Sequence, residues 1–113
     1  MSAFPTIKAT AAGATAPLVL NMLQGYSPYF SPTPAWALGL IATVSPGASL
    51  TYNVEITGDQ QPNNATGNWN AHDTMTALTG SANGNVAFPI TGIRLNVTSY
   101  VSGSVSLGVV QWP

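Results

Sequence analysis

Apolar and polar residues alternate along the last quarter of the chain, in two runs separated by a short polar segment. The apolar positions are Ile93, Leu95 and Val97 in the first run and Val105, Leu107 and Val109 in the second. A period of two is typical of a half-buried β-strand, because successive side chains leave opposite faces of the pleat. Gly103 lies between the runs and can adopt the positive φ that a short turn often requires. The pattern predicts an antiparallel hairpin over residues 88–111.

A second pair of alternating runs lies in the middle of the chain. Its apolar positions are Trp36, Leu38, Leu40 and Ala42 in residues 36–44, and Leu50, Tyr52, Val54 and Ile56 in residues 49–57. Both faces of the first run are apolar or small, which indicates a central or covered strand. The connecting residues, Ser-Pro-Gly-Ala at 45–48, have the chemistry of a tight turn. These runs predict a second hairpin.

The segments between the two predicted hairpins are rich in turn residues. Residues 58–68 form the most polar part of the chain and are expected to be a loop. In residues 69–79 a helical turn competes with extended structure. Residues 81–85, SANGN, contain an Asn-Gly pair, which predicts another tight turn before a short strand that starts at residue 86.

The N-terminal third is rich in small residues and proline. Residues 1–17 are expected to form an arm, with an edge strand near residues 4–7, because proline is tolerated at edges and strand starts; a mobile terminus is the alternative. Residues 25–34 are expected to form an ordered loop whose rings either cap the core or make a contact surface, where aromatic residues are favoured. The rings of this loop belong to Tyr26, Tyr29 and Phe30.

The fold class follows from six to eight short strands, Gly/Pro/Asn turns and little helix. This combination is typical of an all-β protein, and we expect an antiparallel β-sandwich that is jelly-roll-like. A chain of 113 residues has the length of one domain. We assign residues 1–17 to the arm or edge strand and residues 18–113 to a single β-sandwich domain.

The scarcity of charge excludes several classes of function. Only 4% of the residues are charged, and the net charge is −1. Two basic residues cannot neutralise a run of phosphates or hold an anionic membrane surface, so we expect neither nucleic-acid nor membrane binding. A free monomer normally keeps charge on its surface for solubility. So neutral a surface suggests that identical copies or a large partner cover much of it.

Cysteine usage and the N-terminal residues indicate the cellular compartment in which the protein is made. The chain has no cysteine, which excludes disulfides, thiolate metal sites and cysteine nucleophiles. Its first twenty residues lack a basic segment followed by an apolar one, so we expect no secretory signal. No run reaches the roughly 18 apolar residues of a membrane span. Production in the cytosol fits these features.

Few residues are candidates for catalysis. His72 and Asp73 are adjacent, and a histidine oriented by a carboxylate can act as a general base; however, neighbours in an extended segment point to opposite faces, and a structural role bonded to backbone is preferred. One histidine without ligand spacing does not predict a metal site. Glu55 with Asp59 or Asp73 is the remaining carboxylate pair that a glycosidase would need. We predict no catalytic, cofactor-binding or metal-binding residue, and no enzyme activity.

Two further features concern binding. Arg94 lies mid-strand on a polar face, where it either pairs with Glu55 on a neighbouring strand or contacts another subunit. A carbohydrate-binding module is the alternative class, because small β-sandwiches stack sugar rings on exposed aromatic residues. The aromatic candidates for such stacking are Trp36, Trp69, Trp112, Tyr26 and Tyr29.

Six short strings in the C-terminal half are distinctive when taken together: NWNAHD (68–73), MTALT (75–79), SANGN (81–85), FPI (88–90), IRLNVT (93–98) and SGSV (102–105). Through these strings, about residues 50–111 resemble small proteins encoded in the structural-gene region of tailed bacteriophages, and among these the head decoration or cement proteins. It implies a virion protein on the capsid surface that binds the major capsid protein and forms a homo-oligomer, most often a trimer. Another virion position, in the tail, neck or fibre, is the alternative.

Cement proteins act by burying surface against capsomers, which suits a neutral, cysteine-free β domain. We therefore expect the contacts to come from the N-terminal arm, the loops at residues 25–34 and 58–68, and one charged strand position. The predicted contact residues are Phe4, Ile7, Tyr26, Tyr29, Phe30, Trp69 and Arg94.

Overall fold

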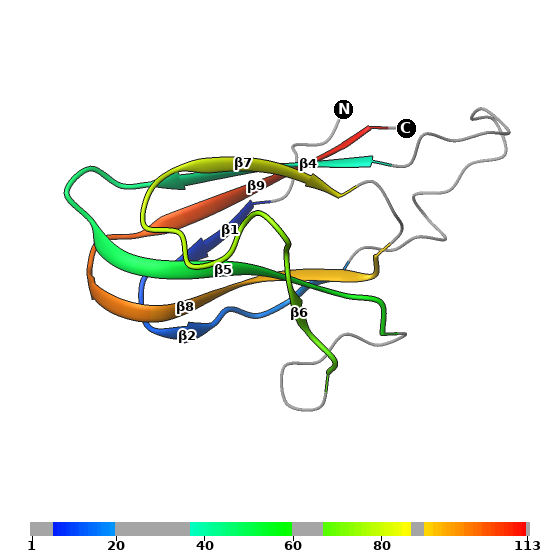
Figure 1. Ribbon diagram of the computed structural model, residues 1–113, viewed down its shortest axis with the longest axis horizontal. Coiled ribbons are helices and arrows are strands. Elements are labelled where there is room, and N and C mark those ends of the chain that lie inside the picture. Colours follow the sequence, from blue (N-terminus) through cyan, green and yellow to red (C-terminus); the bar gives the residue numbers. More distant parts are fainter. Residues whose placement is uncertain (1–5, 20–36, 60–66, 87–89, 113) are drawn as a thin grey trace, which may run out of the picture.

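The computed structural model describes residues 6–19, 37–59, 67–86 and 90–112, and these residues contain strands but no helix. The strands are β1 (Thr6–Ala9), β2 (Gly13–Ala14), β3 (Leu18–Val19), β4 (Ala37–Val44), β5 (Ser49–Thr57), β6 (Asn70–Ala71), β7 (Ala82–Val86), β8 (Gly92–Ser102) and β9 (Val105–Trp112). They form two antiparallel sheets that pack face to face (Figure 1). The prediction of an all-β sandwich is confirmed.

The order of the strands identifies the type of sandwich. Sheet A has the order β1-β9-β4-β7, and sheet B has the order β2-β8-β5-β6, with β3 also paired to β8. Because β2 and β3 lie along the same edge of β8, they act as one interrupted strand. Apart from the β2–β3 and β5–β6 connections, every connection then passes from one sheet to the other. This is the eight-strand plan of a jelly roll, as the sequence predicted.

Both predicted hairpins are wrong, although their strands are present. β4 pairs with β7 and β9, whereas β5 pairs with β6 and β8, so β4 and β5 lie in opposite sheets. β8 and β9 are separated in the same way. Alternation identifies the buried face of each strand but not the strand with which it pairs. Two strands with apolar faces can bury those faces either as neighbours in one sheet or from opposite sheets across the core of a sandwich.

The two turns that replace the hairpins pack against each other at one end of the sandwich. The Ser45 N–H donates to the Ser104 carbonyl (2.9 Å), and the Ser104 N–H donates to the Ser45 hydroxyl (3.0 Å). Gly103 has a φ of 90°, as its place in the sequence suggested. A Cβ at Gly103 would lie 2.7 Å from the Ala48 Cα and even nearer to the Ala48 Cβ. The close approach of Gly103 and Ala48 therefore locks the two turns together.

Segments that cross between the sheets close both sides of the sandwich. On one side β1 pairs with β9 of sheet A, and the chain then continues as β2 and β3 on β8 of sheet B. On the other side residues 70–78 run beside β5, where Tyr52 and Leu78 exchange two backbone hydrogen bonds of 2.9 Å. Residues 69–79 are therefore extended and irregular, without the helical turn that the sequence left open.

The predicted turn at residues 81–85 is also wrong. Residues 82–85 belong to β7, and Asn83 pairs with Ile41 of β4. Gly84 has a packing role instead, because a Cβ at this position would lie 2.6 Å from the sulfur of Met75, which is fully buried. The Asn-Gly pair thus reflects the close approach of Met75 and not a reversal of the chain.

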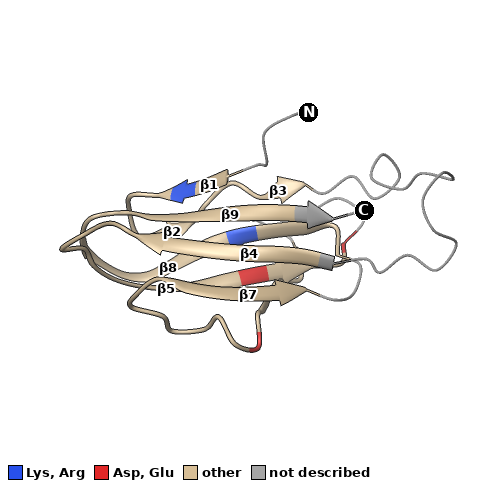
Figure 2. Cartoon of the chain, turned by 90° about the horizontal axis from the view of Figure 1, so that it is seen from above, with Lys and Arg blue, Asp and Glu red and all other residues tan. Residues whose placement is uncertain are grey.

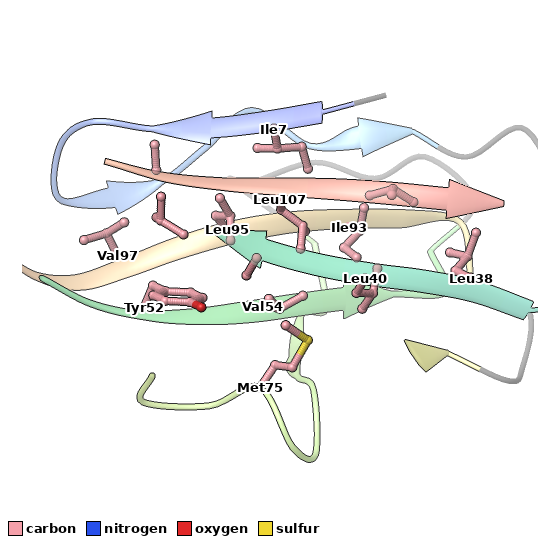
Figure 3. Packing of buried hydrophobic residues seen from close by; sticks show 14 of the residues in the cluster. Ile7, Leu38, Leu40, Tyr52, Val54, Met75, Ile93, Leu95, Val97 and Leu107 are labelled. Carbon is pink, nitrogen blue, oxygen red and sulfur yellow. The ribbon is translucent and has the colours of Figure 1, made fainter. Parts of the chain in front are cut away.

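The hydrophobic core fills the space between the sheets (Figure 3). Every apolar position on the alternating faces of β8 and β9 named above is buried, as predicted. Ile7 and Ala9 of β1 also lie in the core, with 8% and 4% of their surface exposed. From residue 6 onward the N-terminal segment is therefore part of the sandwich, and β1 is an edge strand of sheet A.

Candidate functional site

His72 and Asp73 do not form a catalytic pair. The Nδ1 of His72 accepts the Thr74 N–H (3.2 Å), so the ring proton lies on Nε2, which donates to the Asn85 carbonyl (2.6 Å). The side chain of His72 is 9% exposed, whereas that of Asp73 is exposed. His72 therefore ties residues 70–78 to β7, which is the structural role that the sequence favoured.

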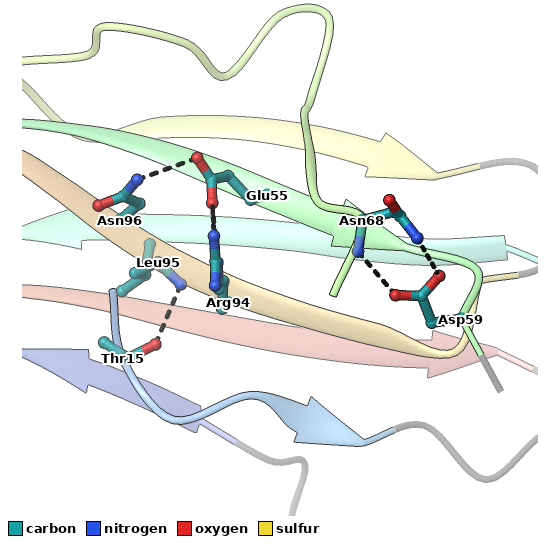
Figure 4. A network of polar contacts seen from close by, with 7 residues as sticks. All are labelled: Thr15, Glu55, Asp59, Asn68, Arg94, Leu95 and Asn96. Atoms are coloured by element: carbon teal, nitrogen blue, oxygen red, sulfur yellow. Dashed lines mark hydrogen bonds and ion pairs between the residues drawn. The ribbon is translucent and has the colours of Figure 1, made fainter. Parts of the chain in front are cut away.

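The predicted ion pair between Glu55 and Arg94 is confirmed. The two residues are directly opposite each other on β5 and β8, and the Arg94 Nη2 lies 2.6 Å from the Glu55 Oε1. The second carboxylate oxygen of Glu55 accepts a hydrogen bond from the Asn96 side chain (3.0 Å; Figure 4). The side chains of Arg94 and Glu55 are only 11% and 12% exposed. Sheet B therefore neutralises its own charges on its outer face.

Trp69 covers this ion pair. The guanidinium carbon of Arg94 lies 4.4 Å from the centroid of the Trp69 ring, the geometry of a cation–π contact. The structure thus brings together two of the predicted contact residues, and both are engaged within their own chain. Trp69, one of the five aromatic residues proposed for sugar stacking, contributes to the packing of sheet B.

Asp59 ties the two ends of a polar segment. Its carboxylate accepts the Asn68 backbone N–H (2.7 Å) and the Asn68 side-chain amide (3.3 Å; Figure 4). These two hydrogen bonds, the backbone one first, hold the pKa of Asp59 below its ordinary value. Asp59 therefore acts as a loop anchor, whereas the Glu55 carboxylate is engaged with Arg94 and Asn96.

The outer face of sheet A differs from that of sheet B. Along the described parts of its four strands the single charged residue is Lys8, on the edge strand β1 (Figure 2). In the two central strands, the outward positions between the buried ones include Gly39, Ile41, Gly108 and Val110. Ile41 is 50% exposed. We define this uncharged surface of β4 and β9 as the sheet A face.

The sheet A face was not predicted from the sequence. The signal was present, because Gly39 and Gly108 interrupt otherwise regular strand patterns away from any turn. Alternation alone does not show whether a small outward residue faces water or another surface.

An open pocket of about 300 Å³ lies at the β6 edge of sheet B, with Ile56 and Ile90 as apolar lining and Asn70 and Asp73 as polar lining. Within the described ranges, no three His, Cys, Asp or Glu side chains gather as metal ligands. Nor do the described residues include a helix that is long and apolar enough to cross a membrane. Neither finding assigns a chemistry to the pocket.

Most of the predicted contact residues cannot be placed. Phe4, Tyr26, Tyr29 and Phe30 lie outside the described residues. Ile7, as shown above, contributes its side chain to the core. Comparison with known proteins found no matching family model, no matching curated protein and no matching solved structure. Any functional proposal therefore depends on the resemblance described above, on the residues and on their geometry.

Proposed function

We propose that this chain is a structural virion protein of a tailed bacteriophage. It acts as a head decoration or cement protein, which binds the lattice of the major capsid protein and also associates with copies of itself on the capsid surface. The resemblance of its C-terminal half to such proteins supports this proposal, and it implies a trimer. A jelly roll alone does not decide the question, because capsid proteins and lectins both use this fold.

The observation that carries the proposal is the sheet A face. An uncharged face loses little hydration free energy when a partner covers it, whereas a face with unpaired charges loses much more. Gly39 and Gly108 carry no side chain on this face, and Ile41 exposes half of its surface to water. The charges of Glu55 and Arg94, which would oppose burial, are already paired with each other. These features suit a protein that functions through buried contact.

Binding to phage heads tests the proposal. Heads prepared without the protein are mixed with the purified chain and sedimented, and we expect saturable binding with a fixed number of copies per head. Ile41→Asp places a charge on the sheet A face and should weaken binding at least about tenfold. Val101→Asp is the matched control, because Val101 is 73% exposed but lies in β8; it should bind normally.

Two results would contradict the decoration role. The first is no sedimentation with heads of the phage that encodes the chain. The second is antibody labelling of intact virions at the tail, neck or fibre, which would favour the alternative virion position. Circular dichroism of both variants shows whether the fold is retained.

A further inference from the structure

The outward side chains of the two central strands of sheet A alternate between bulky and absent. Gly39 of β4 is directly opposite Val110 of β9, and Ile41 of β4 is directly opposite Gly108 of β9. Each of these two cross-strand pairs therefore has one aliphatic side chain and one gap. The aliphatic side chain belongs to β9 in the first pair and to β4 in the second. The result is a two-by-two pattern of protrusions and gaps at the centre of the sheet A face.

The packing of the chain itself does not require these glycines. Neither Gly39 nor Gly108 is among the glycines with positive φ. A Cβ at Gly39 would lie 3.7 Å from the Val110 Cβ, and a Cβ at Gly108 would lie 3.8 Å from the Ile41 carbonyl oxygen; both are ordinary contacts. Glycine within a strand costs stability, and it often marks a place where another backbone approaches closely. The gaps on this face therefore leave room for a partner.

We propose that this partner is a second copy of the same chain, bound face to face through sheet A. If a twofold axis runs along the strands between β4 and β9, each β4 lies over the β9 of the other copy. Ile41 then enters the gap at Gly108 of the second copy, and Val110 enters the gap at Gly39. The same face supplies both the protrusions and the gaps in matching positions, so it is complementary to itself.

The charges on sheet A are compatible with this arrangement. In the same geometry the edge strand β1 lies over β7 of the second copy, since β1 and β7 are the two edges of sheet A. Lys8 then meets the end of a strand without charged residues, and the two lysines lie at opposite edges of the contact. No like charges are brought together. The described strands of sheet A contain no acidic residue, so the contact buries no carboxylate.

The size of the face sets the strength of the contact. The four strands of sheet A lie about 4.8 Å apart and are four to eight residues long, so they span about 400 Å² per copy. The two copies together bury about 800 Å², less than the roughly 1,000 Å² of a stable specific interface, so the contact is a weak one. A dissociation constant on the order of 100 µM is therefore expected. On a capsid, where many copies are held close together, a contact of this strength becomes occupied. The inference rests on the proposed function and deepens it, because it assigns the sheet A face to the contact between copies; the weaker head binding expected for Ile41→Asp then follows from the loss of that contact.

Sedimentation velocity between about 10 µM and 1 mM protein measures the association. Wild type should shift from monomer to dimer over this range. Gly108→Ile fills one gap and should abolish the dimer, while thermal stability is unchanged or higher, because β-branched residues favour exposed strand positions. The double variant Ile41→Gly with Gly108→Ile moves the protrusion to the opposite strand and should restore the dimer. Thr98→Val, at an exposed position of β8, should dimerise as wild type does.

A monomer at 1 mM, or a dimer or trimer that Gly108→Ile leaves intact, would overturn the self-contact. The binding assay with phage heads separates this result from the proposed function. Protein that stays monomeric but still coats heads would refute the self-contact and leave the decoration role intact. Protein that dimerises through sheet A but never binds heads would refute the decoration role and leave the self-contact intact.

Discussion

Replacing Gly103 with alanine tests the way in which the chain turns between the sheets. Gly103 lies in the β8–β9 turn with a φ of 90°, and its neighbour in space is Ala48 of the β4–β5 turn. If β8 and β9 formed the hairpin that alternation alone predicts, the new methyl group would not meet the β4–β5 turn. In the jelly roll the methyl group meets the backbone of Ala48.

The magnitude follows from two separate costs. A positive φ destabilises an alanine by about 1–2 kcal/mol. The new Cβ would also lie 2.7 Å from the Ala48 Cα and 2.9 Å from the Ser45 hydroxyl oxygen, and overpacking of this kind costs about 1–3 kcal/mol. We expect a total loss of about 3–4 kcal/mol from the free energy of unfolding. This is a large part of the 5–15 kcal/mol typical of a single domain.

Urea denaturation of two matched variants separates the two costs. Gly47 also has a positive φ, 75°, but a Cβ there meets nothing within 4 Å, so Gly47→Ala should lose only about 1–2 kcal/mol. Combining Gly103→Ala with Ala48→Gly should recover part of the larger loss, because one of the colliding atoms is removed. Equal losses for Gly103→Ala and Gly47→Ala would refute the packed turns and favour a hairpin with its turn in solvent.

Two further predictions concern the polar contacts of sheet B and its loop. Arg94→Met should lower the free energy of unfolding by about 3 kcal/mol, since it leaves the poorly exposed Glu55 carboxylate without its cationic partner. Adding Glu55→Leu should reduce that loss. Urea denaturation measures both variants, and a larger loss in the double variant would contradict the reasoning. Because the pKa of Asp59 is lowered on folding, its anchoring of Asn68 should persist below pH 3.8 and disappear as the pH falls through the folded pKa. The Asn68 amide resonance in an NMR titration reports this step, and a midpoint above pH 3.8 would count against it.

The sequence predicted the strands and their buried faces because both depend on local alternation. The apolar positions of β8 and β9 all lie in the core, and Gly103 has the expected positive φ. Pairing was mispredicted because it depends on contacts between residues that are far apart in the chain. β4 and β9, for example, are paired over eight residue positions, yet about sixty residues separate them. Nothing in either strand alone distinguishes this partner from the strand that follows in the sequence.

The candidate site was less predictable than the fold. The opposite charges of Glu55 and Arg94 on polar strand faces suggested their ion pair as one of two alternatives, and the structure shows that pair. Ile7 was assigned to a contact surface as part of the N-terminal arm, but alternation within β1 directs it into the core. The sheet A face was missed because Gly39 and Gly108 lie in different strands. Only the register of β4 and β9 shows that each glycine is opposite an aliphatic residue on the same face.

The scarcity of charge and the closure of the sandwich are connected. Soluble β proteins often protect their edge strands with charged residues, because unpaired edges recruit strands from other molecules. This chain has too few charges to do so, and it instead keeps the edge strands short and crosses each open side with a segment that joins the sheets. Lys8 on β1 is the one charged residue on the described edge strands. Strand addition is therefore disfavoured at both edges. The remaining uncharged β surface is a sheet face, so self-association is expected to proceed by packing side chains and not by extending a sheet.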